Sequence, residues 1–538
     1  MKLSRWPLWV VMPLALLTIT PLVVVAASWA LREPEIWQHL RDYVLARVLL
    51  NTLILTVFVG LGVALLGVSL AWITVMCEFP GRRWLGGALM LPLALPAYVL
   101  AFVHVGLMEY SGPVQTLWRS ATGLTGGLPS VRSTGGAVVV FCLALYPYVY
   151  LLARQAFQTQ GEQCLQAAQT LGLSRRQAFW RVAVPMARPW WAAGIGLALM
   201  EVLADFGTVA IFNIDTFTTA IYKTWLGMFN LAVASQLASL LALGVLALVW
   251  LEQGARASRQ FGASAKGQGR SRIVLTGTAA WAATGSCLLV LAAAFIAPVL
   301  QLLFWVVRLA AADLDLRYWG YLLNSLMLSG LTALVVLGAA LALAYAERAS
   351  EGQQGQRRVA ALVRLANLGY AFPGMLLSVG LFVPVAWLDD QLLAWTQSLG
   401  LAPLPLLKGA LAVMVVALAV RFMAVGFNPI QAAMQRITPN QERAARSLGL
   451  GAWQSLRRLH LPLLRPGLLS AALLVFVEVM KEMPITLMTR PFGWDTLAVR
   501  IYEMTSEGMW ERAALPSVCV VLAGLLPIFL LVRTGEQQ

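Results

Sequence analysis

One stretch of this sequence occurs twice and decides the fold. It reads "AAQTLGLSRRQAFWRVAVPMARP" from Ala167 to Pro189 and "AARSLGLGAWQSLRRLHLPLLRP" from Ala444 to Pro466. Both stretches are basic, and both interrupt a chain that is otherwise mostly apolar. A glycine and two prolines recur at an offset of 277 residues: Gly172 and Gly449, Pro185 and Pro462, Pro189 and Pro466.

The composition around these stretches is that of a membrane protein. Of 538 residues, 59% are hydrophobic and 12% are charged, whereas a soluble domain carries about a quarter charged residues. Apolar runs of about 20 residues cross a bilayer as helices, because the backbone must satisfy its own hydrogen bonds in lipid. We therefore expect an all-α integral membrane protein with about twelve transmembrane helices. The predicted spans lie near 7–30, 48–76, 84–108, 135–153, 189–212, 231–251, 273–306, 321–345, 359–388, 405–425, 466–488 and 513–533.

The basic residues predict the orientation of these spans. With both termini in the cytoplasm, the cytoplasmic side holds 26 of the 39 basic residues, counting Arg421, but 7 of the 24 acidic ones. An excess of Lys and Arg in cytoplasmic loops is the usual topology signal, and the opposite orientation would invert it. The net charge of +15 is therefore interpreted as a topology signal rather than as a nucleic-acid-binding surface.

The duplication extends beyond the quoted stretch. Pro96 corresponds to Pro373, "LLNTLILT" around Asn51 corresponds to "LLNSLMLS" around Asn324, and "DTFTTAIYK" from Asp215 corresponds to "DTLAVRIYE" from Asp495. Because each copy has an even number of predicted spans, the copies insert in parallel, as two halves related by an axis along the membrane normal. The expected domains are a first span with an outer segment (1–45), copy 1 (46–251), a cytoplasmic linker (252–272), a seventh span with an outer segment (273–320), copy 2 (321–533) and a tail (534–538).

Both repeated stretches fall in predicted cytoplasmic loops, named here loop 1 (166–189) and loop 2 (443–466). A glycine ends a helix readily, and a proline suits the start of one. We expect two short helices in each loop, with the prolines ending the second helix and restarting the chain into the next span. The alternative is a pair of ordinary basic loops. Pro96 and Pro373 are interpreted as kinks within spans.

The pattern Ala-Ala-x3-Gly-x12-Pro-x3-Pro resembles the EAA loop of the membrane subunits of binding-protein-dependent ABC importers, the MetI-like permeases. In that family the first helix of the loop is the coupling helix, which docks on the ATPase subunit. The family's initial Glu is replaced by Gln166 and Arg443. The coupling residues implied by the resemblance are Gln166, Ala167, Ala168 and Gly172 in loop 1, and Arg443, Ala444, Ala445 and Gly449 in loop 2.

The fused double form resembles the ferric-iron permease branch in particular. The stretches that carry this resemblance are "EVLADFGTVAIFNIDTFTTAIYKTW" and "FVEVMKEMPITLMTRPFGWDTLAVRIYEM". The resemblance implies a dimeric ATP-binding subunit at the cytoplasmic face and a periplasmic iron-binding protein at the outer face. It also implies a multi-pass location in a bacterial inner membrane and no bound cofactor. ATP would be used by the partner subunit, because the chain has no phosphate-binding Gly-Lys-Ser/Thr order and no catalytic arrangement of its own.

Four acidic residues in predicted spans are candidates for the translocation path. Glu201 and Asp205 are four residues apart, and Glu478 and Glu482 repeat that spacing, so each pair is expected on one helix face. A carboxylate facing lipid costs several kcal/mol, so these groups should face an aqueous path or a basic partner. One interpretation is a path for Fe³⁺, which prefers oxygen donors; the other is structural pairing, for example with Lys481 or Arg490.

Two tyrosines, Tyr222 and Tyr502, occupy corresponding positions near the predicted outer mouth and could add phenol oxygens to the path. Interfacial tyrosines also occur for lipid reasons alone. No certain metal ligand stands out. The competing functions are import of thiamine, phosphonate or another small solute by the same class of transporter, and a gradient-driven secondary transporter, which would have no need for two equivalent docking loops.

Overall fold

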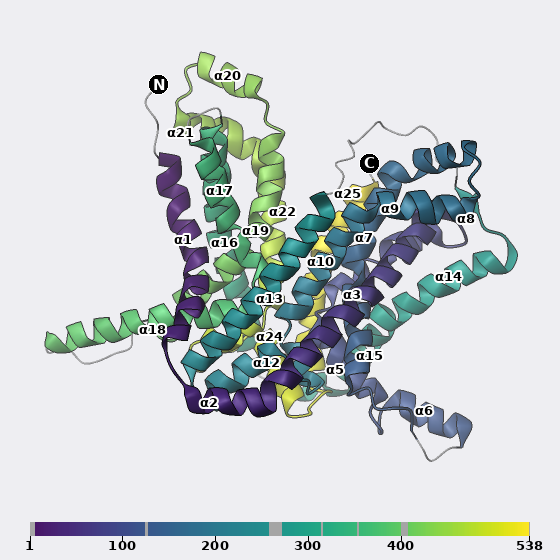
Figure 1. Ribbon diagram of the computed structural model, residues 1–538, viewed down its shortest axis with the longest axis horizontal. Helices are drawn as coiled ribbons and strands as arrows, with labels where there is room; N and C mark the ends of the chain where they lie inside the picture. Colours follow the sequence, from purple (N-terminus) through teal and green to yellow (C-terminus); the bar gives the residue numbers. More distant parts are fainter. Residues whose placement is uncertain are drawn as a thin grey trace. The chain divides into compact units, whose positions relative to one another are not determined.

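The computed structural model describes residues 6–123, 127–257, 272–313, 316–351, 355–399 and 407–536, and it is almost entirely helical (Figure 1). Its α-helices up to the predicted linker are α1 (Trp6–Ala27), α2 (Pro34–His39), α3 (Leu45–Met76), α4 (Arg82–Ala88), α5 (Ala97–Met108), α6 (Pro113–Thr122), α7 (Thr134–Thr170), α8 (Arg175–Ala178), α9 (Val184–Met186), α10 (Arg188–Ala204), α11 (Gly207–Ile211), α12 (Phe217–Tyr222) and α13 (Leu231–Ala257). Most of the predicted linker, 258–271, lies outside the described residues.

The α-helices after the linker are α14 (Gly277–Leu291), α15 (Ala297–Asp313), α16 (Leu316–Ser350), α17 (Gln356–Ala366), α18 (Gly374–Ser398), α19 (Leu411–Gln435), α20 (Pro439–Ser447), α21 (Ala452–Ser455), α22 (Leu461–Lys481), α23 (Pro484–Thr489), α24 (Leu497–Ser506) and α25 (Ala514–Glu536). Short 3₁₀ segments (η1, η3, η7) cover Ser28–Ala30, Leu91–Ala94 and Leu368–Ala371, and π segments (η2, η4, η5, η6, η8) cover Leu40–Val44, Phe179–Ala183, Lys223–Gly227, Ala292–Ile296 and Leu456–His460. Two two-residue strands, β1 (Cys77–Glu78) and β2 (Ile273–Val274), pair in parallel.

Within the described residues, nine helices are long and apolar enough to cross a membrane. A tenth candidate is a bent pair, Arg82–Ala94 with Ala97–Thr122, whose two parts meet at 95°. Ala514–Pro527 is a shorter apolar helix at the place of the last predicted span. The predicted span at 189–212 is not among the nine, because its helix ends at Ala204. The helical membrane architecture is therefore confirmed, whereas the count of twelve stays a prediction.

The chain folds as two compact units, and each contains segments from both halves of the sequence. One unit consists of Met1–Pro34, Ile221–Ala242 and Leu314–Arg500, and the other of Glu35–Ala220, Leu243–Asp313 and Ile501–Gln538. Helix α1 therefore belongs with copy 2, whereas α14, α15 and α25 belong with copy 1. The first span of the sequence thus completes the core of the second repeat, which no local pattern predicts.

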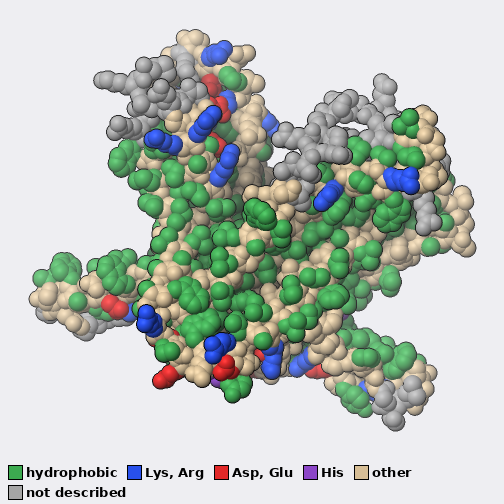
Figure 2. Space-filling view, in the orientation of Figure 1, with side chains coloured by type: hydrophobic (Ala, Val, Ile, Leu, Met, Phe, Trp, Pro, Cys, Tyr) green, Lys and Arg blue, Asp and Glu red, His purple; other side chains and the backbone are tan. Residues whose placement is uncertain are grey.

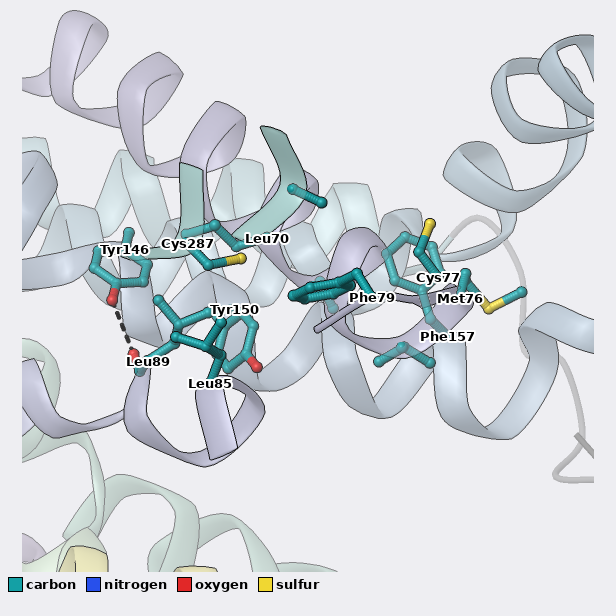
Figure 3. Close-up of a cluster of buried hydrophobic side chains, with 14 of the residues drawn as sticks. Leu70, Met76, Cys77, Phe79, Leu85, Leu89, Tyr146, Tyr150, Phe157 and Cys287 are labelled. Carbon is teal, nitrogen blue, oxygen red and sulfur yellow. Dashed lines mark hydrogen bonds between the residues drawn. The ribbon is translucent and has the colours of Figure 1, made fainter. Parts of the chain in front are cut away.

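In the unit built on copy 1, α3 packs along α7, and α10 packs on both. Aromatic side chains fill the core between these helices and the short helix α4 (Figure 3). Tyr146 and Tyr150 are fully buried, and their hydroxyls donate to the carbonyl oxygens of Leu89 (2.9 Å) and Gly86 (2.8 Å). These bonds satisfy the carbonyls where the helix ends before the break at residue 95.

In the unit built on copy 2, α16, α19 and α22 pack together, and α1 lies against α16, α17 and α18. Close contact is possible because Gly380 of α18 has no side chain: a Cβ there would lie 2.6 Å from the backbone of Pro21 in α1. The buried hydroxyl of Thr18 in α1 also donates to the carbonyl of Ala366, at the end of α17, at 3.2 Å. This hydrogen bond joins α1 to α17. Packing by small residues and hydroxyls is typical of helices in lipid.

Many long apolar side chains point outward from these helices. Leu61 and Leu65 of α3 are 64% and 71% exposed, and Leu334 of α16 is 70% exposed. Figure 2 shows hydrophobic side chains along the lengths of the helices, with charged side chains gathered near helix ends. Contiguous apolar surface of this extent requires lipid as its solvent.

Pro96 and Pro373 do more than kink a helix. In both copies a 3₁₀ turn ends two residues earlier, the preceding residue is extended, and the proline starts a new helix, α5 or α18. A proline pushes the residue before it out of the helical region, so the chain breaks there. The expectation of kinks within continuous spans was therefore wrong: each predicted span consists of two helices.

Candidate functional site

Loops 1 and 2 contain the same turn. Gly172 and Gly449 have φ of +83° and +78°, and the amide of the next residue reaches back across the turn. Leu173 donates to the Ala168 carbonyl (3.0 Å), and Leu450 donates to the Ala445 carbonyl (3.1 Å). This is a Schellman ending with a left-handed glycine. The predicted role of the two glycines as helix terminators is confirmed.

The predicted coupling residues lie on the helix that leads into this turn. Ala168 and Ala445 are buried at corresponding positions, whereas Arg443 and Ala444 are exposed. Gln166 and Ala167 lie in α7, but their side chains are outside the described part of the structure. Just before the turn, each loop exposes the leucine of the repeated pattern, which was not among the predicted coupling residues: Leu171 (83% exposed) and Leu448 (80% exposed).

The first helix of each loop is built differently in the two copies. In loop 1 it is the end of α7, which runs unbroken for 37 residues into the turn. In loop 2 the preceding helix, α19, ends at Gln435, and a separate nine-residue helix, α20, begins at Pro439 (Figure 1). Thr438 caps α20, since its amide donates to the Gln441 side chain at 2.9 Å. Two helices per loop were expected, and loop 2 has them as separate elements.

The prolines at the ends of the two loops do not have the same effect in both copies, although the prediction was the same for both. In loop 1 the chain leaves the helix for one residue, Ala187, before α10 begins. In loop 2 α22 continues through Pro466, so the expected break is absent there. A five-residue π segment precedes Pro185 and Pro462 in the respective loops, and a wider helical turn of this kind accommodates a proline that has no N–H to donate.

The paired acids do not share a helix face. Helix α10 ends at Ala204, and helix α22 ends at Lys481, so Asp205 and Glu482 stand in extended backbone after each helix. Asp205 accepts from the amides of Thr208 (2.8 Å) and Val209 (3.2 Å), and also from the Thr208 hydroxyl. The expectation that the two acids of each pair share one helix face was therefore wrong, because each helix ends before its second acid.

Glu482 repeats the arrangement of Asp205. It accepts from the amides of Ile485 (2.9 Å) and Thr486 (3.2 Å), which begin α23. A carboxylate at a helix N-terminus satisfies amides that have no partner within the helix and interacts favourably with the helix dipole. Each half thus carries a broken helix whose second part is capped by an acid.

Basic partners distinguish the second pair of acids. Lys481 lies 3.5 Å from Glu478, as the structural interpretation suggested, whereas Arg490 pairs with Asp495. Glu482, which is 6% exposed, interacts electrostatically with Arg421. Arg421 lies inside α19, is 8% exposed, and donates to the Phe372 carbonyl at 3.0 Å. Counting Arg421 with the cytoplasmic loop residues was therefore wrong.

The two breaks in copy 2 meet at Glu482. A Cβ on Gly374, the first residue of α18, would lie 2.9 Å from the Glu482 carboxylate and 3.2 Å from Ile485 and Pro484. In copy 1 the corresponding residues are Ala97 and Asp205. Copy 2 therefore combines the longer acid, Glu482, with glycine, and copy 1 combines the shorter acid, Asp205, with alanine.

The remaining candidates, Tyr222 and Tyr502, are both partly buried, and they belong to different units. The Tyr502 ring lies 5.2 Å from that of Phe206, which follows Asp205. Among the described residues, no group of three or more His, Cys, Asp or Glu side chains could hold a metal ion.

Two corresponding asparagines form hydrogen bonds that the sequence analysis did not predict, although the repeat itself is visible in the sequence. Each of these hydrogen bonds is called an asparagine tie here. Asn51 donates to the Asp215 carbonyl and Asn324 donates to the Asp495 carbonyl, both at 3.0 Å. Each tie fastens the beginning of one helix, α3 or α16, to the segment before α12 or α24. The repeated "LLN" and "DT" segments were the available signal.

The loops, broken helices and asparagine hydrogen bonds thus recur in both halves of the chain, and comparison with known families identifies the repeated domain. The model of the family described as "Binding-protein-dependent transport system inner membrane component" matches residues 63–252 and again 338–534. The chain belongs to this family and carries its domain twice. It is a multi-pass membrane protein of the ABC-importer permease class.

Individual relatives differ in the solute that their names give. The chain is 26% identical over 497 residues to the Fe(3+)-transport system permease protein FbpB 2 of Haemophilus influenzae, an alignment that covers 90% of both chains. It is 29% identical over 206 residues to the sulfate transport system permease protein CysT of Synechocystis sp., covering 38% of this chain and 70% of that one. It is 30% identical over 149 residues to the molybdenum transport system permease protein ModB of Escherichia coli, covering 27% of this chain and 62% of that one.

Proposed function

We propose that this chain is the membrane-spanning subunit of an importer that moves ferric iron delivered by a periplasmic binding protein. A separate pair of ATP-binding subunits would drive it by alternating access. The observation that carries the cargo is the similarity to the Fe(3+) permease over 90% of both chains, since the sulfate and molybdenum permeases align with only part of this chain.

The two loops support the coupling role. Both present a helix, an exposed leucine and a left-handed glycine turn at corresponding positions. An ATPase dimer offers two equivalent docking sites, so a single chain with two such loops can engage both. On ATP binding the subunits close, the loops move with them, and the helices that continue from the loops carry the movement to the broken helices.

The acids support an uneven path. In copy 2, Lys481 and Arg421 offset the charges of Glu478 and Glu482. The corresponding positions in copy 1 are Ala204 and Ala144, so the surroundings of the acids differ between the copies. If carboxylates guide a cation through the permease, Glu201, Asp205, Glu478 and Glu482 are the candidates in the two copies.

The orientation proposed from the arginine bias puts loops 1 and 2 and both termini in the cytoplasm. An epitope tag between 258 and 271 should react only from the cytoplasmic side, and one near 123–127 only from outside. Reversed labelling would exclude the proposed docking face.

An oxyanion is the second candidate cargo. The named solutes of two relatives support it, and so does Arg421, whose Nε is buried and has no hydrogen-bond partner within the described residues. A buried guanidinium suits sulfate- or molybdate-like anions, which it can bind through two parallel hydrogen bonds.

The deciding experiment measures uptake into proteoliposomes that contain the permease, its ATPase subunit and the binding protein. ATP-dependent accumulation of ⁵⁵Fe³⁺, unaffected by excess sulfate or molybdate, is expected. Accumulation of ³⁵S-sulfate or ⁹⁹Mo-molybdate instead, with no uptake of iron, would assign the oxyanion cargo.

A further inference from the structure

A cluster of three side chains links loop 2 and the start of α20 to α16. Glu442 of α20 lies 3.1 Å from the Arg348 guanidinium of α16 and 3.2 Å from the His460 ring of η8, which leads into α22. All three side chains are largely enclosed, with exposed fractions of 14% for Arg348, 17% for Glu442 and 5% for His460. Shielded pairs of this kind are stronger than ion pairs at the open surface.

Arg348 also holds the break that precedes α20. Its guanidinium donates to the Ile437 carbonyl at 2.9 Å, and Ile437 lies between the end of α19 and the start of α20. One side chain therefore contacts both the interruption itself and the helix that follows it. A third contact, to the half-exposed Glu351 at 2.9 Å, stays within the end of its own helix.

His460 completes the cluster from the far side of the loop. Its Nε2 faces the Glu442 carboxylate, and its Nδ1 faces the Ser455 carbonyl at 3.1 Å. Both neighbours are acceptors, and an imidazolium can donate to both. The Tyr345 ring of α16 lies edge-on to the imidazole, with centroids 5.6 Å apart, and closes this side.

Copy 1 has no such cluster at the corresponding positions. Val75, Leu165 and Ala183 stand where copy 2 has Arg348, Glu442 and His460, and Val75 and Ala183 belong to the apolar core. Copy 1 also has no proline at the start of its coupling helix, since Glu162 replaces Pro439. Its coupling helix is the unbroken end of α7.

We propose that Arg348, Glu442 and His460 form a brace that replaces helical continuity in loop 2 and transmits movement of the second coupling helix to α16, α19 and α22. In copy 1 the covalent helix performs this task. The proposal rests on the proposed coupling function of the loops. The three residues are positioning residues, since they act through α20 rather than on the solute.

The test uses the complete permease, reconstituted with its ATPase subunit, and a readout that is independent of the cargo. A cysteine replaces Leu487 in α23, and its reaction with a maleimide is timed before and after ATP–vanadate trapping. The unaltered protein should show a rate change of at least about fivefold, within the usual range of coupling between sites. Co-purification of the ATPase is measured in parallel.

Glu442→Gln keeps the shape and removes the charge. It should retain the ATPase but lose the change in labelling rate. The matched control is Glu351→Gln, the same chemical change on another partner of Arg348, which should keep the full response because that contact does not cross the break. Where Glu442→Gln fails to assemble, the triple change Arg348→Val, Glu442→Leu and His460→Ala removes every charge and gives the same expected result.

Restoring the helix provides the decisive arm. Thr438→Ala with Pro439→Ala removes the cap and the proline, which disfavours a helix interior by about 3 kcal/mol. Added to Glu442→Gln or to the triple change, it should restore the labelling response. A full response in Glu442→Gln, or no rescue by helix restoration, would overturn the brace. Failure of the unaltered permease to bind any ATPase would instead overturn the proposed function.

Discussion

The broken helices of the two copies show what a duplicated membrane fold keeps and what it changes. In both copies an acid follows a helix end and caps the next helix: Asp205 in copy 1 and Glu482 in copy 2. Copy 1 places Ala97 and Ala144 at the positions where copy 2 has Gly374 and Arg421. The two copies thus share the geometry of the helix break, but they differ in the charged residues around it.

This difference has a consequence for stability and another for transport. In copy 2 the acid also accepts from two amides, and buried Arg421 adds a favourable electrostatic interaction with it. Copy 1 fixes its break by the hydrogen bonds of Asp205 to Thr208 and Val209. We expect copy 2 to be the more sensitive half when one charge is removed, and uptake by amide variants of the acids in both copies would test the proposed cation path.

The largest effect is expected from Arg421→Met. Arg421 donates to the Phe372 carbonyl and interacts electrostatically with Glu482, so its removal leaves a buried acceptor without its donor; losing a hydrogen bond from a charged group costs about 1.5–3 kcal/mol. The full-length permease should lose most of its yield and melt earlier in a detergent thermal-shift assay. Arg421→Met with Glu482→Gln should recover the melting temperature. A stable single variant would mean that Arg421 does not hold the break.

A smaller loss is expected from Gly374→Ala, because the new Cβ would lie 2.9 Å from the Glu482 carboxylate. Overpacking of this kind costs about 1–3 kcal/mol. Glu482→Asp in the same protein recreates the copy 1 combination and should recover the lost stability. The comparison between copies fails if the double variant melts lower than Gly374→Ala alone.

The glycine turns should respond alike in both loops. A Cβ at Gly172 or Gly449 meets no neighbouring atom within 4 Å, so the main cost of Gly172→Val or Gly449→Val is backbone strain at positive φ, about 1–3 kcal/mol each. The permease should still insert, while co-purification of the ATPase and uptake decrease. Gly451→Ala, also in open space, is the control. Normal uptake in the double valine variant would remove the loops from the mechanism.

The smallest effect is the pH dependence that Glu442 of copy 2 contributes to stability. Burial raises the pKa of Glu442, but hydrogen bonds from His460 and Arg348 and the charge of Arg348 outweigh burial and hold the pKa below its usual range. A carboxyl with a lowered pKa stabilises the fold above its unfolded pKa and loses that contribution as pH falls through the folded value. When melting temperatures are measured at successively lower pH, starting from pH 7, they should begin to decrease once the pH is below about 4.5. If the Glu442→Gln variant shows the same decrease in melting temperature, other carboxyl groups cause the decrease.

Much of this architecture follows from local sequence. Long apolar runs predict the helices, the offset of 277 residues predicts the two halves, and Gly172 and Gly449 predict the turns. The end of α22 also had a signal, since Pro484 two residues after Glu482 favours a new helix start. Helix α10 had only Asp205 followed by Thr208, a weak cap signal inside an apolar run.

Contacts between distant segments could not be predicted in the same way. Arg348 and Glu442 are 94 residues apart, and α1 packs against helices more than 300 residues away. Packing of apolar helices in lipid depends on small residues and shape rather than on a sequence period. The partner of Glu482 was missed for this reason: Arg421 resembles a loop arginine until α19 is seen to continue to Gln435.

The central claim is that a separate ATPase drives this permease through loops 1 and 2. The most direct measurement is solute uptake by proteoliposomes with the binding protein, with and without the ATPase subunit, and with ATP or an imposed ion gradient. The account predicts uptake of ferric iron only when the ATPase and ATP are both present, and its loss when Gly172 and Gly449 are both valine. Uptake driven by the gradient alone, without the ATPase subunit, would contradict it.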